Sequence, residues 1–164
     1  MTDGVRPLAE LDQAQFFGDV LGELAGTLEN LIGVEDAAGF IADVGCGIGR
    51  QLACRYGVTR GASPRAVAQT CLDLKERAGG AFEIERATDR DITMIGRKCR
   101  FGGREAGRPS LCMMTTNVFG RIAAEAAGYA NVRISSARAM GDPVCRVSIR
   151  FTPPVDGAGT DFFA

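Results

Sequence analysis

The 164-residue sequence contains no histidine. Histidine is the general base of Ser-His-Asp triads, a common ligand of catalytic zinc and of haem, and the usual switch near neutral pH. Sites that depend on an imidazole from this chain are therefore excluded. Any catalytic or metal chemistry must use Cys, Asp, Glu, Tyr, Arg or one of only two lysines, Lys75 and Lys98.

The sequence also lacks a strong net charge and a long apolar run. Its 19 basic and 20 acidic residues nearly cancel, and the basic residues are spread along the chain, which argues against a nucleic-acid-binding surface. No segment reaches the ~18 consecutive apolar residues of a membrane span, and the N-terminus has neither the basic nor the apolar region of a signal peptide. We therefore expect a cytoplasmic protein that contacts no membrane.

Cysteine, by contrast, is well represented, with six residues and no CxxC pair. Without a signal peptide these residues are expected to be reduced thiols and not disulfides. They are Cys46, Cys54, Cys71, Cys99, Cys112 and Cys145.

The first half of the chain predicts helices. Apolar residues at spacings of three and four over residues 8–32 indicate an amphipathic helix that is wide enough to serve also as an oligomer face, and Gly33 ends it. Ser63 followed by Pro64 is typical of a helix start, and this helix is expected to stop at Gly79.

The second half predicts a small antiparallel sheet. Residues 81–87 and 92–96 form an expected hairpin, a helix capped by Ser110 ends at Gly128, and two further strands follow. Those strands cover Val132 and Ile134, and residues 145–151, where apolar and polar side chains alternate.

This order of elements predicts an α+β fold, with N-terminal helices packed on an antiparallel sheet. We expect a single domain over residues 8–153, an N-terminal tail over 1–7 and a frayed C-terminal tail over 154–164.

One glycine-rich segment allows two interpretations. Asp43–Gly49 (Asp-Val-Gly-Cys-Gly-Ile-Gly) resembles motif I of class I S-adenosylmethionine-dependent methyltransferases, which implies a loop that holds this cofactor. The acid expected after the next strand is missing from residues 58–62. In the alternative interpretation the segment is helical, and Ala42, Gly45 and Gly49 let a neighbouring helix pack closely.

Three longer blocks, Cys99–Gly102, Gly107–Gly120 and Ala139–Arg146, resemble the methanogen output domain, a relative of the four-vinyl reductase-like small-molecule-binding domain. The resemblance implies a ligand-binding fold shared with haem–nitric-oxide sensor-like domains and vesicle-tethering subunits, with a cavity between helices and sheet. It also implies a homodimer formed through N-terminal helices, a sensory or output role, small apolar ligands, and cysteines that hold a metal or respond to redox state.

Cys99, Cys112 and Cys145 fall on the motif positions of this resemblance. Three thiolates can hold zinc or an iron–sulfur cluster, and Asp142 or Glu125 could supply a fourth ligand to zinc. Cys112 lies in the first turn of its predicted helix, where the dipole favours a thiolate and a redox role. The alternative is that all three are packing residues.

The motif helix also carries candidate ligand-binding residues, namely Met113, Met114, Asn117 and Phe119, although such a stripe more often belongs to a core. Together these features favour a small-molecule, redox or metal-sensing regulatory domain that acts through a regulatory protein partner and has no enzymatic activity of its own. The alternatives are a methyltransferase and a structural adaptor that binds no ligand.

Overall fold

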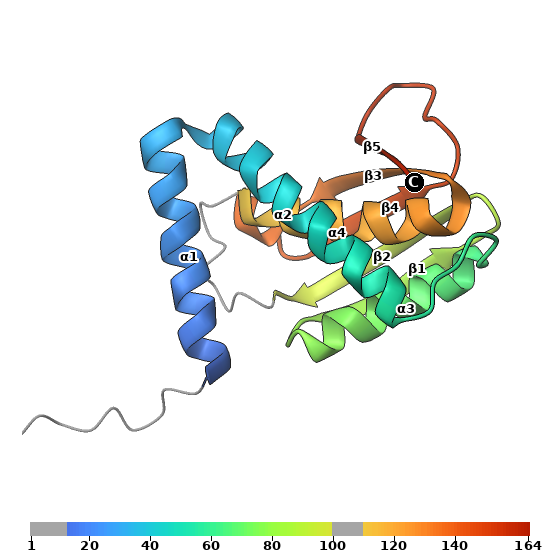
Figure 1. Ribbon diagram of the computed structural model, residues 1–164, viewed down its shortest axis with the longest axis horizontal. Helices are drawn as coiled ribbons and strands as arrows, with labels where there is room; N and C mark the ends of the chain where they lie inside the picture. The colour runs from blue at the N-terminus through green and yellow to red at the C-terminus, as the bar shows by residue number, and fades with distance from the viewer. Residues whose placement is uncertain (1–12, 100–109) are drawn as a thin grey trace, which may run out of the picture.

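The computed structural model describes residues 13–99 and 110–164. These residues form four α-helices, a short 3-10 helix and five strands, and Figure 1 shows how the α-helices and strands are arranged. The elements are α1 (Gln13–Ile32), α2 (Val34–Arg55), α3 (Pro64–Arg77), β1 (Ala81–Ala87), β2 (Asp91–Lys98), α4 (Ser110–Ala127), β3 (Tyr129–Ser136), η1 (Arg138–Met140), β4 (Cys145–Arg150) and β5 (Thr160–Phe163).

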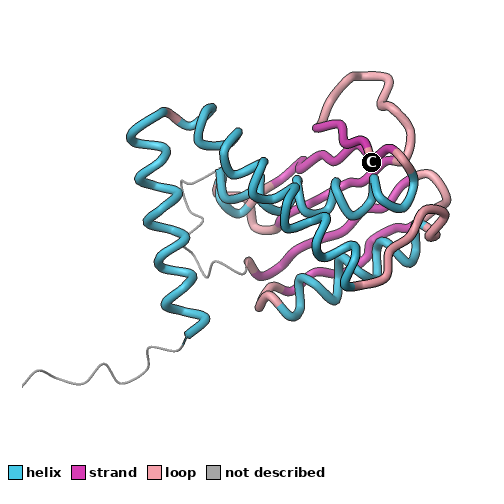
Figure 2. Tube along the Cα trace, in the orientation of Figure 1, coloured by secondary structure: helices cyan, strands magenta, loops and turns pink. Residues whose placement is uncertain are grey.

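The strands form one antiparallel sheet in the order β1-β2-β4-β3-β5. Helices α3 and α4 lie against one face of this sheet, α2 packs on α4, and α1 stands apart from the sheet (Figure 2). The architecture is therefore the predicted α+β fold. No helix within residues 13–99 and 110–164 has the length and apolar composition needed to cross a bilayer.

The first residues of α3 and α4 test the two helix caps predicted at Ser63 and Ser110. The Ser63 hydroxyl accepts a hydrogen bond from the backbone N–H of Ala66 at 3.2 Å, and Pro64 is the first residue of α3, which confirms the predicted cap. At α4 the prediction was wrong, because Ser110 is the first helical residue and not the cap. Its hydroxyl instead donates to the carboxylate of Glu29 on α1.

The glycine-rich segment lies in the middle of α2, so the methyltransferase-loop interpretation is wrong and the helical one is confirmed. Gly45 and Gly49 are buried against α4. A Cβ on either glycine would lie 2.8 Å from the Cβ of Asn117 or of Arg121, respectively. The two helices pack this closely because both contact positions lack side chains. Ala42, the third small residue of that interpretation, is only half-buried.

The C-terminal segment corrects the expectation of a frayed tail. Strand β5 pairs with residues 129–132 of β3, and the Asp161 carboxylate accepts hydrogen bonds from the Tyr129 hydroxyl at 2.6 Å and the Asn131 amide at 2.8 Å. Phe162 is buried in the core. The N-terminal tail predicted over 1–7 lies outside the described residues.

The main core lies between the sheet and helices α3 and α4. A second, smaller cluster joins α1, α2 and the start of α4 through Ala25, Ile41 and Leu111. The largest fully buried apolar side chains of the main core are Val67, Ile92, Met94, Phe119, Ile122, Val132, Val147 and Ile149.

Candidate functional site

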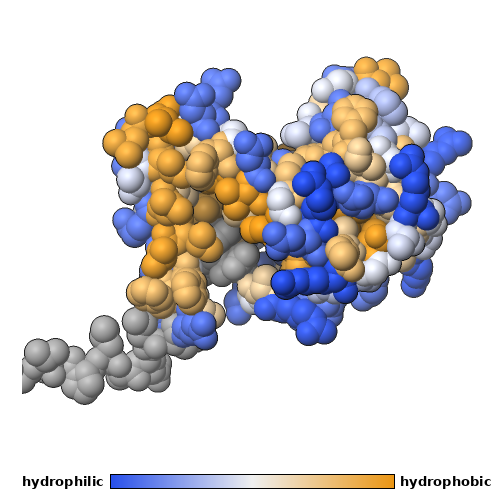
Figure 3. Space-filling model, in the orientation of Figure 1, coloured by the Kyte–Doolittle hydropathy of each residue, from blue (hydrophilic) through white to orange (hydrophobic). Residues whose placement is uncertain are grey.

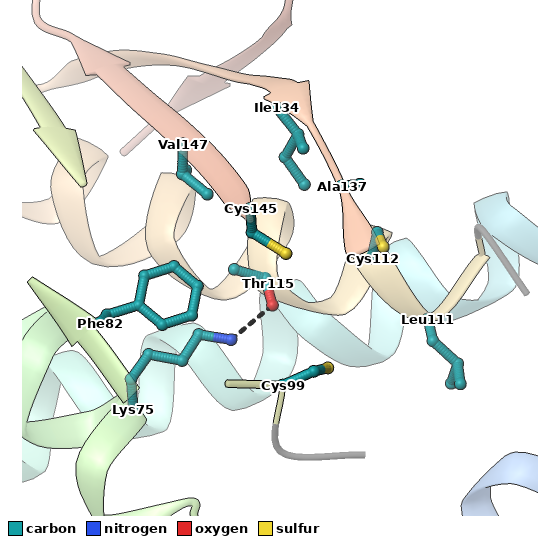
Figure 4. Close-up of a pocket in the computed structure, with 10 residues that line it drawn as sticks. All are labelled: Lys75, Phe82, Cys99, Leu111, Cys112, Thr115, Ile134, Ala137, Cys145 and Val147. Carbon is teal, nitrogen blue, oxygen red and sulfur yellow. Dashed lines mark hydrogen bonds between the residues drawn. The ribbon is translucent and has the colours of Figure 1, made fainter. Parts of the chain in front are cut away.

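A narrow pocket of ≈ 30 Å³ lies between the first turns of α4 and the ends of strands β2, β3 and β4. We call it the thiol pocket, because all three cysteines of the family-like motifs line it (Figure 4). Its lining residues are Lys75, Phe82, Cys99, Leu111, Cys112, Thr115, Ile134, Ala137, Cys145 and Val147.

The sheet register explains why distant cysteines meet here. Cys145 begins β4 opposite Gly96 of β2, and Cys99 follows three residues later on that side of the sheet. Cys112 lies in the first turn of α4, which covers the same end of the sheet. The three cysteines therefore line one pocket, and each of them is half-buried.

The described side chains around these thiols are not arranged as a metal site. Across the described parts of the chain, no group of three or more Cys, Asp or Glu residues could hold a metal ion. The suggested fourth ligands have other partners, since Asp142 accepts the backbone N–H of Ala137 at 2.7 Å and Glu125 pairs with Arg121 at 2.6 Å. The zinc or iron–sulfur centre stays a prediction.

Lys75 is a candidate functional residue that the sequence patterns did not single out. Its side chain is only 8% exposed, and its ammonium donates a hydrogen bond to the Thr115 hydroxyl at 2.7 Å. The ammonium also lies 5.0 Å from the ring centroid of Phe82 and 5.4 Å from that of Phe119, within the range of cation–π attraction. A buried lysine is rare in proteins and marks a site worth explaining.

The position of Lys75 follows from the helical repeat of α3. Val67 and Cys71 precede it at spacings of four, so all three residues lie on the buried face of this helix. That spacing was a signal in the sequence, because it places one of only two lysines in line with core residues.

The other three cysteines do not line the thiol pocket. Burial raises the pKa of the Cys71 thiol to about 12, so this side chain stays protonated at neutral pH. Burial also raises the pKa of Cys46, whose thiol donates to the Asn117 amide oxygen at 3.5 Å. Cys54 is exposed.

A second pocket of ≈ 190 Å³ lies among the four helices, and we call it the helical pocket. Lys75 and Thr115 line both pockets and form the boundary between them. The remaining lining of the helical pocket is apolar throughout and consists of Leu21, Val44, Ile48, Leu52, Leu74, Ala78, Met114, Val118 and Phe119.

The predicted ligand-binding residues are not all brought together. Met114 and Phe119 line the helical pocket, whereas Met113 lines a separate open groove beside β3. Asn117 lies at the contact between α2 and α4, where its amide donates to the Met113 carbonyl at 2.8 Å. Two of the four predicted residues therefore share a pocket with Lys75.

Two solved structures resemble this fold. The phenol-responsive sensory domain of the transcription activator PoxR, solved with phenol, is 17% identical with a TM-score of 0.69, over 81% of this chain and 73% of that chain. Trafficking protein particle complex subunit 3 from Naegleria fowleri, covalently bound to palmitic acid, is 10% identical with a TM-score of 0.59, over 84% of this chain and 93% of that chain. At such identities the similarity establishes a shared fold.

Sequence comparison identifies the family. No curated protein gives a significant match to the chain. The family model of methanogen output domain 1 matches residues 20–150, which span helices α1 to α4 and strands β1 to β4. The chain therefore belongs to the methanogen output domain 1 family.

Proposed function

We propose that this protein is a ligand-responsive regulatory domain that binds a compact apolar molecule in the helical pocket and acts on a protein partner. The observation that carries the proposal is the Lys75–Thr115 hydrogen bond at the boundary of two pockets. Ligand sites typically combine an apolar lining with a few polar groups that orient the ligand. The helical pocket has this composition, with Lys75 and Thr115 as its polar residues.

The size of the pocket sets the size of the ligand. An apolar cavity of about 150 Å³ is sufficient to bind benzene, and the helical pocket measures ≈ 190 Å³. The thiol pocket, at ≈ 30 Å³, has room for only one or two water molecules. We therefore assign a single ring or a short branched chain to the helical pocket. The phenol in the PoxR domain and the palmitic acid on the trafficking subunit support an apolar ligand in this fold.

The polar end of the ligand would meet Lys75 and Thr115. The rings of Phe82 and Phe119 hold the ammonium in place, and its hydrogen bond orients the Thr115 hydroxyl. A hydroxyl or carbonyl group on the ligand can accept from the ammonium or exchange hydrogen bonds with Thr115. An apolar molecule without such a group cannot make this hydrogen bond, so it should bind more weakly.

Phenol and toluene are suitable probes, because they differ in one hydroxyl at nearly equal size. Ligand-observed NMR should detect phenol binding to the wild-type protein, with toluene weaker by roughly 10-fold, as about 1.4 kcal/mol for one hydrogen bond implies. Lys75→Met should remove this preference. Lys98→Met is the matched control, since Lys98 is exposed and lines neither pocket.

Two outcomes would overturn the proposal. The first is that no single-ring molecule of a phenol, benzoate and toluene panel binds to the folded protein. The second is that Ala78→Leu, which adds a side chain to the wall of the helical pocket, leaves phenol affinity unchanged. Circular dichroism of each variant separates loss of binding from loss of fold.

A second candidate function is thiol-based sensing at the thiol pocket, and the observation in its favour is the shared position of Cys99, Cys112 and Cys145. The backbone N–H of Arg138 donates to the Cys145 sulfur at 3.4 Å and so holds this side chain in place beside the pocket. Zinc and iron content and visible absorbance after anaerobic purification test the metal form, with Cys112→Ser as the variant. Absence of both metals, together with no Cys112-dependent response to peroxide, removes this candidate.

A further inference from the structure

We propose that an acidic group of the ligand binds in an open groove beside the helical pocket, between Arg55 of α2 and Arg77 of α3. This inference rests on the proposed function, because it places the apolar part of the same ligand in the helical pocket. The groove measures ≈ 440 Å³ and lies between the C-terminal ends of the two helices. We call it the arginine groove.

The arginine groove and the helical pocket share part of their walls. Leu52 of α2 and Leu74 and Ala78 of α3 line both of them. Figure 3 shows the change across this side of the molecule, from apolar residues over α1 and the first half of α2 to hydrophilic residues where α2 ends near α3. A molecule in the helical pocket that extends past the three shared side chains therefore leaves apolar surroundings and meets charged ones.

On α2, the residues that line the helical pocket lead to Arg55. Val44, Ile48 and Leu52 line the pocket at spacings of four residues. Arg55 follows Leu52 by three residues, so it continues the same side of the helix one turn later. With a rise of ~1.5 Å per residue, Arg55 lies about 4.5 Å further along the helix axis than Leu52.

On α3, the change from apolar to charged residues occurs around the helix. Ala78 and Leu74 lie about 60° and 100° from Lys75 in one direction, since each residue turns the helix by ~100°. Arg77 follows at about 160° in that direction. The lining on α3 therefore begins at the buried Lys75, continues through two apolar residues and ends at the exposed Arg77.

The Arg77 side chain is held in place by its neighbours. Its Nε donates to the Asp73 carboxylate at 2.6 Å, and the same carboxylate accepts from the Tyr56 hydroxyl at 2.7 Å. Because the bond to Asp73 uses Nε, the two Nη groups of Arg77 remain to donate to a ligand. A guanidinium that is already held loses less rotational freedom when it binds a ligand.

The arginine groove keeps a net positive charge. It is lined by two arginines and one acidic residue, Asp73. Hydrogen bonding from Arg77 is the largest cause that lowers the pKa of Asp73, so this carboxyl is ionised at neutral pH and offsets one arginine. Arg55 is exposed, and its side chain forms no hydrogen bond or ion pair with another described residue. An anion in the groove therefore meets one positive charge that is not offset.

These features favour a carboxylate at the end of a short chain. The planar guanidinium matches the two oxygens of a carboxylate and can donate to both. The step of about 4.5 Å from Leu52 to Arg55 corresponds to roughly three carbon–carbon bonds of ~1.5 Å. The ligand class is therefore an aromatic acid with its ring in the helical pocket and a chain of this length between ring and carboxylate.

Both arginines also lie in the last turns of their helices. A positive charge there stabilises the helix by offsetting the partial negative charge of its C-terminal end. That role alone would affect the stability of the protein, but it would not make the protein prefer an acid to a neutral ligand of the same size. Ligand preference is therefore the measurement that decides between the two roles.

The probes are para-hydroxyphenylpropionate and its primary amide, which have nearly the same size and differ in one charge. In calorimetric titration of the full chain at low ionic strength, the acid should bind roughly 5- to 20-fold more tightly than the amide, as two exposed charge pairs imply. Added salt should reduce this preference, because it screens exposed charges. Arg55→Met and Arg77→Met should each lower the preference by about 2-fold or more, and the double substitution should abolish it.

Arg65→Met is the matched control, because Arg65 is exposed on the same helix as Arg77 and lines neither the arginine groove nor the helical pocket. This variant should keep the full preference for the acid. Phenol fills only the helical pocket, so its affinity should be the same in the wild type and in all the arginine variants.

Equal binding of the acid and the amide to the wild-type protein would overturn the inference, as would an acid preference that survives both arginine substitutions. If phenol binds but the acid is not preferred to the amide, the proposed function stands and the arginine groove is not part of the ligand site. If phenol, the acid and the amide all fail to bind, the proposed function fails and this inference fails with it.

Discussion

Substitution of Gly49 by alanine should measure the close contact between α2 and α4. The added Cβ would lie 2.8 Å from the Cβ of Arg121 and 3.0 Å from the backbone oxygen of Val118. Neither atom can rotate away, since one is backbone and the other is attached to it. The Arg121 side chain is also held at its far end by Glu125 at 2.6 Å. The helices must therefore separate to admit the methyl group.

The expected free-energy change has two opposing parts. Forcing a methyl group into a packed contact costs about 1–3 kcal/mol, and replacing glycine by alanine within a helix gains about 0.5–1 kcal/mol. Gly49→Ala should therefore destabilise the protein by up to roughly 2.5 kcal/mol. Gly47 lies in the same helix with nothing within 4 Å of its added Cβ, so Gly47→Ala shows only the gain and should stabilise.

Urea unfolding followed by circular dichroism gives the change in unfolding free energy of each variant from its transition midpoint. This holds when the unfolding free energies of the variants and of the wild type depend equally on the urea concentration. Because the helical gain is common to both variants, their difference isolates the contact and should be about 1–3 kcal/mol. If Gly49→Ala is as stable as Gly47→Ala, the two helices do not approach as closely as described and the packing argument fails.

Three further predictions concern single side chains. Ser63→Ala should destabilise the protein by about 1 kcal/mol in urea unfolding, because α3 loses its cap. Hydrogen bonding from Tyr129 is the main cause that lowers the pKa of Asp161 below its ordinary 3.8. The stability contributed by the ionised Asp161 is present at neutral pH and is lost as the pH falls through that lowered pKa. Asp161→Asn should therefore reduce the fall in melting temperature between neutral and acidic pH. A thiol reagent should modify Cys54 in the folded protein, whereas Cys71 should react only after unfolding.

The elements that were predicted correctly are those whose signals are local. The cap at Ser63, the hairpin of β1 and β2 and the alternation along β4 each depend on residues a few positions apart. Strand β5 has four residues, two of them adjacent phenylalanines, and so shows no clear alternation. Its Asp161 is bound by Tyr129 and Asn131, which lie 32 and 30 positions away in the sequence. A local sequence pattern cannot predict such a distant contact.

In the candidate site, too, local signals were found from the sequence and distant contacts were not. The cysteines were found by their motif, but their meeting point depends on the register that sets Gly96 opposite Cys145. Lys75 was missed because lysine on a helix is normally solvated, and the sequence does not show that Phe82 and Phe119 lie around its ammonium. The spacing from Val67 and Cys71 was the one indication available.

The glycines of α2 serve helix packing and do not form a cofactor loop. If the proposed function is correct, this packing should also affect ligand binding. Val44 and Ile48 each precede a contact glycine by one residue, so the wall of the helical pocket and the close contact with α4 lie side by side on the same helix. A change that pushes α2 away from α4 at Gly45 or Gly49 must also move Val44 and Ile48 relative to Met114 and Val118 across the pocket. Gly49→Ala should therefore weaken phenol binding as well as stability, whereas Gly47→Ala should leave binding unchanged. If the two variants bind phenol equally, the helical pocket is not the ligand site.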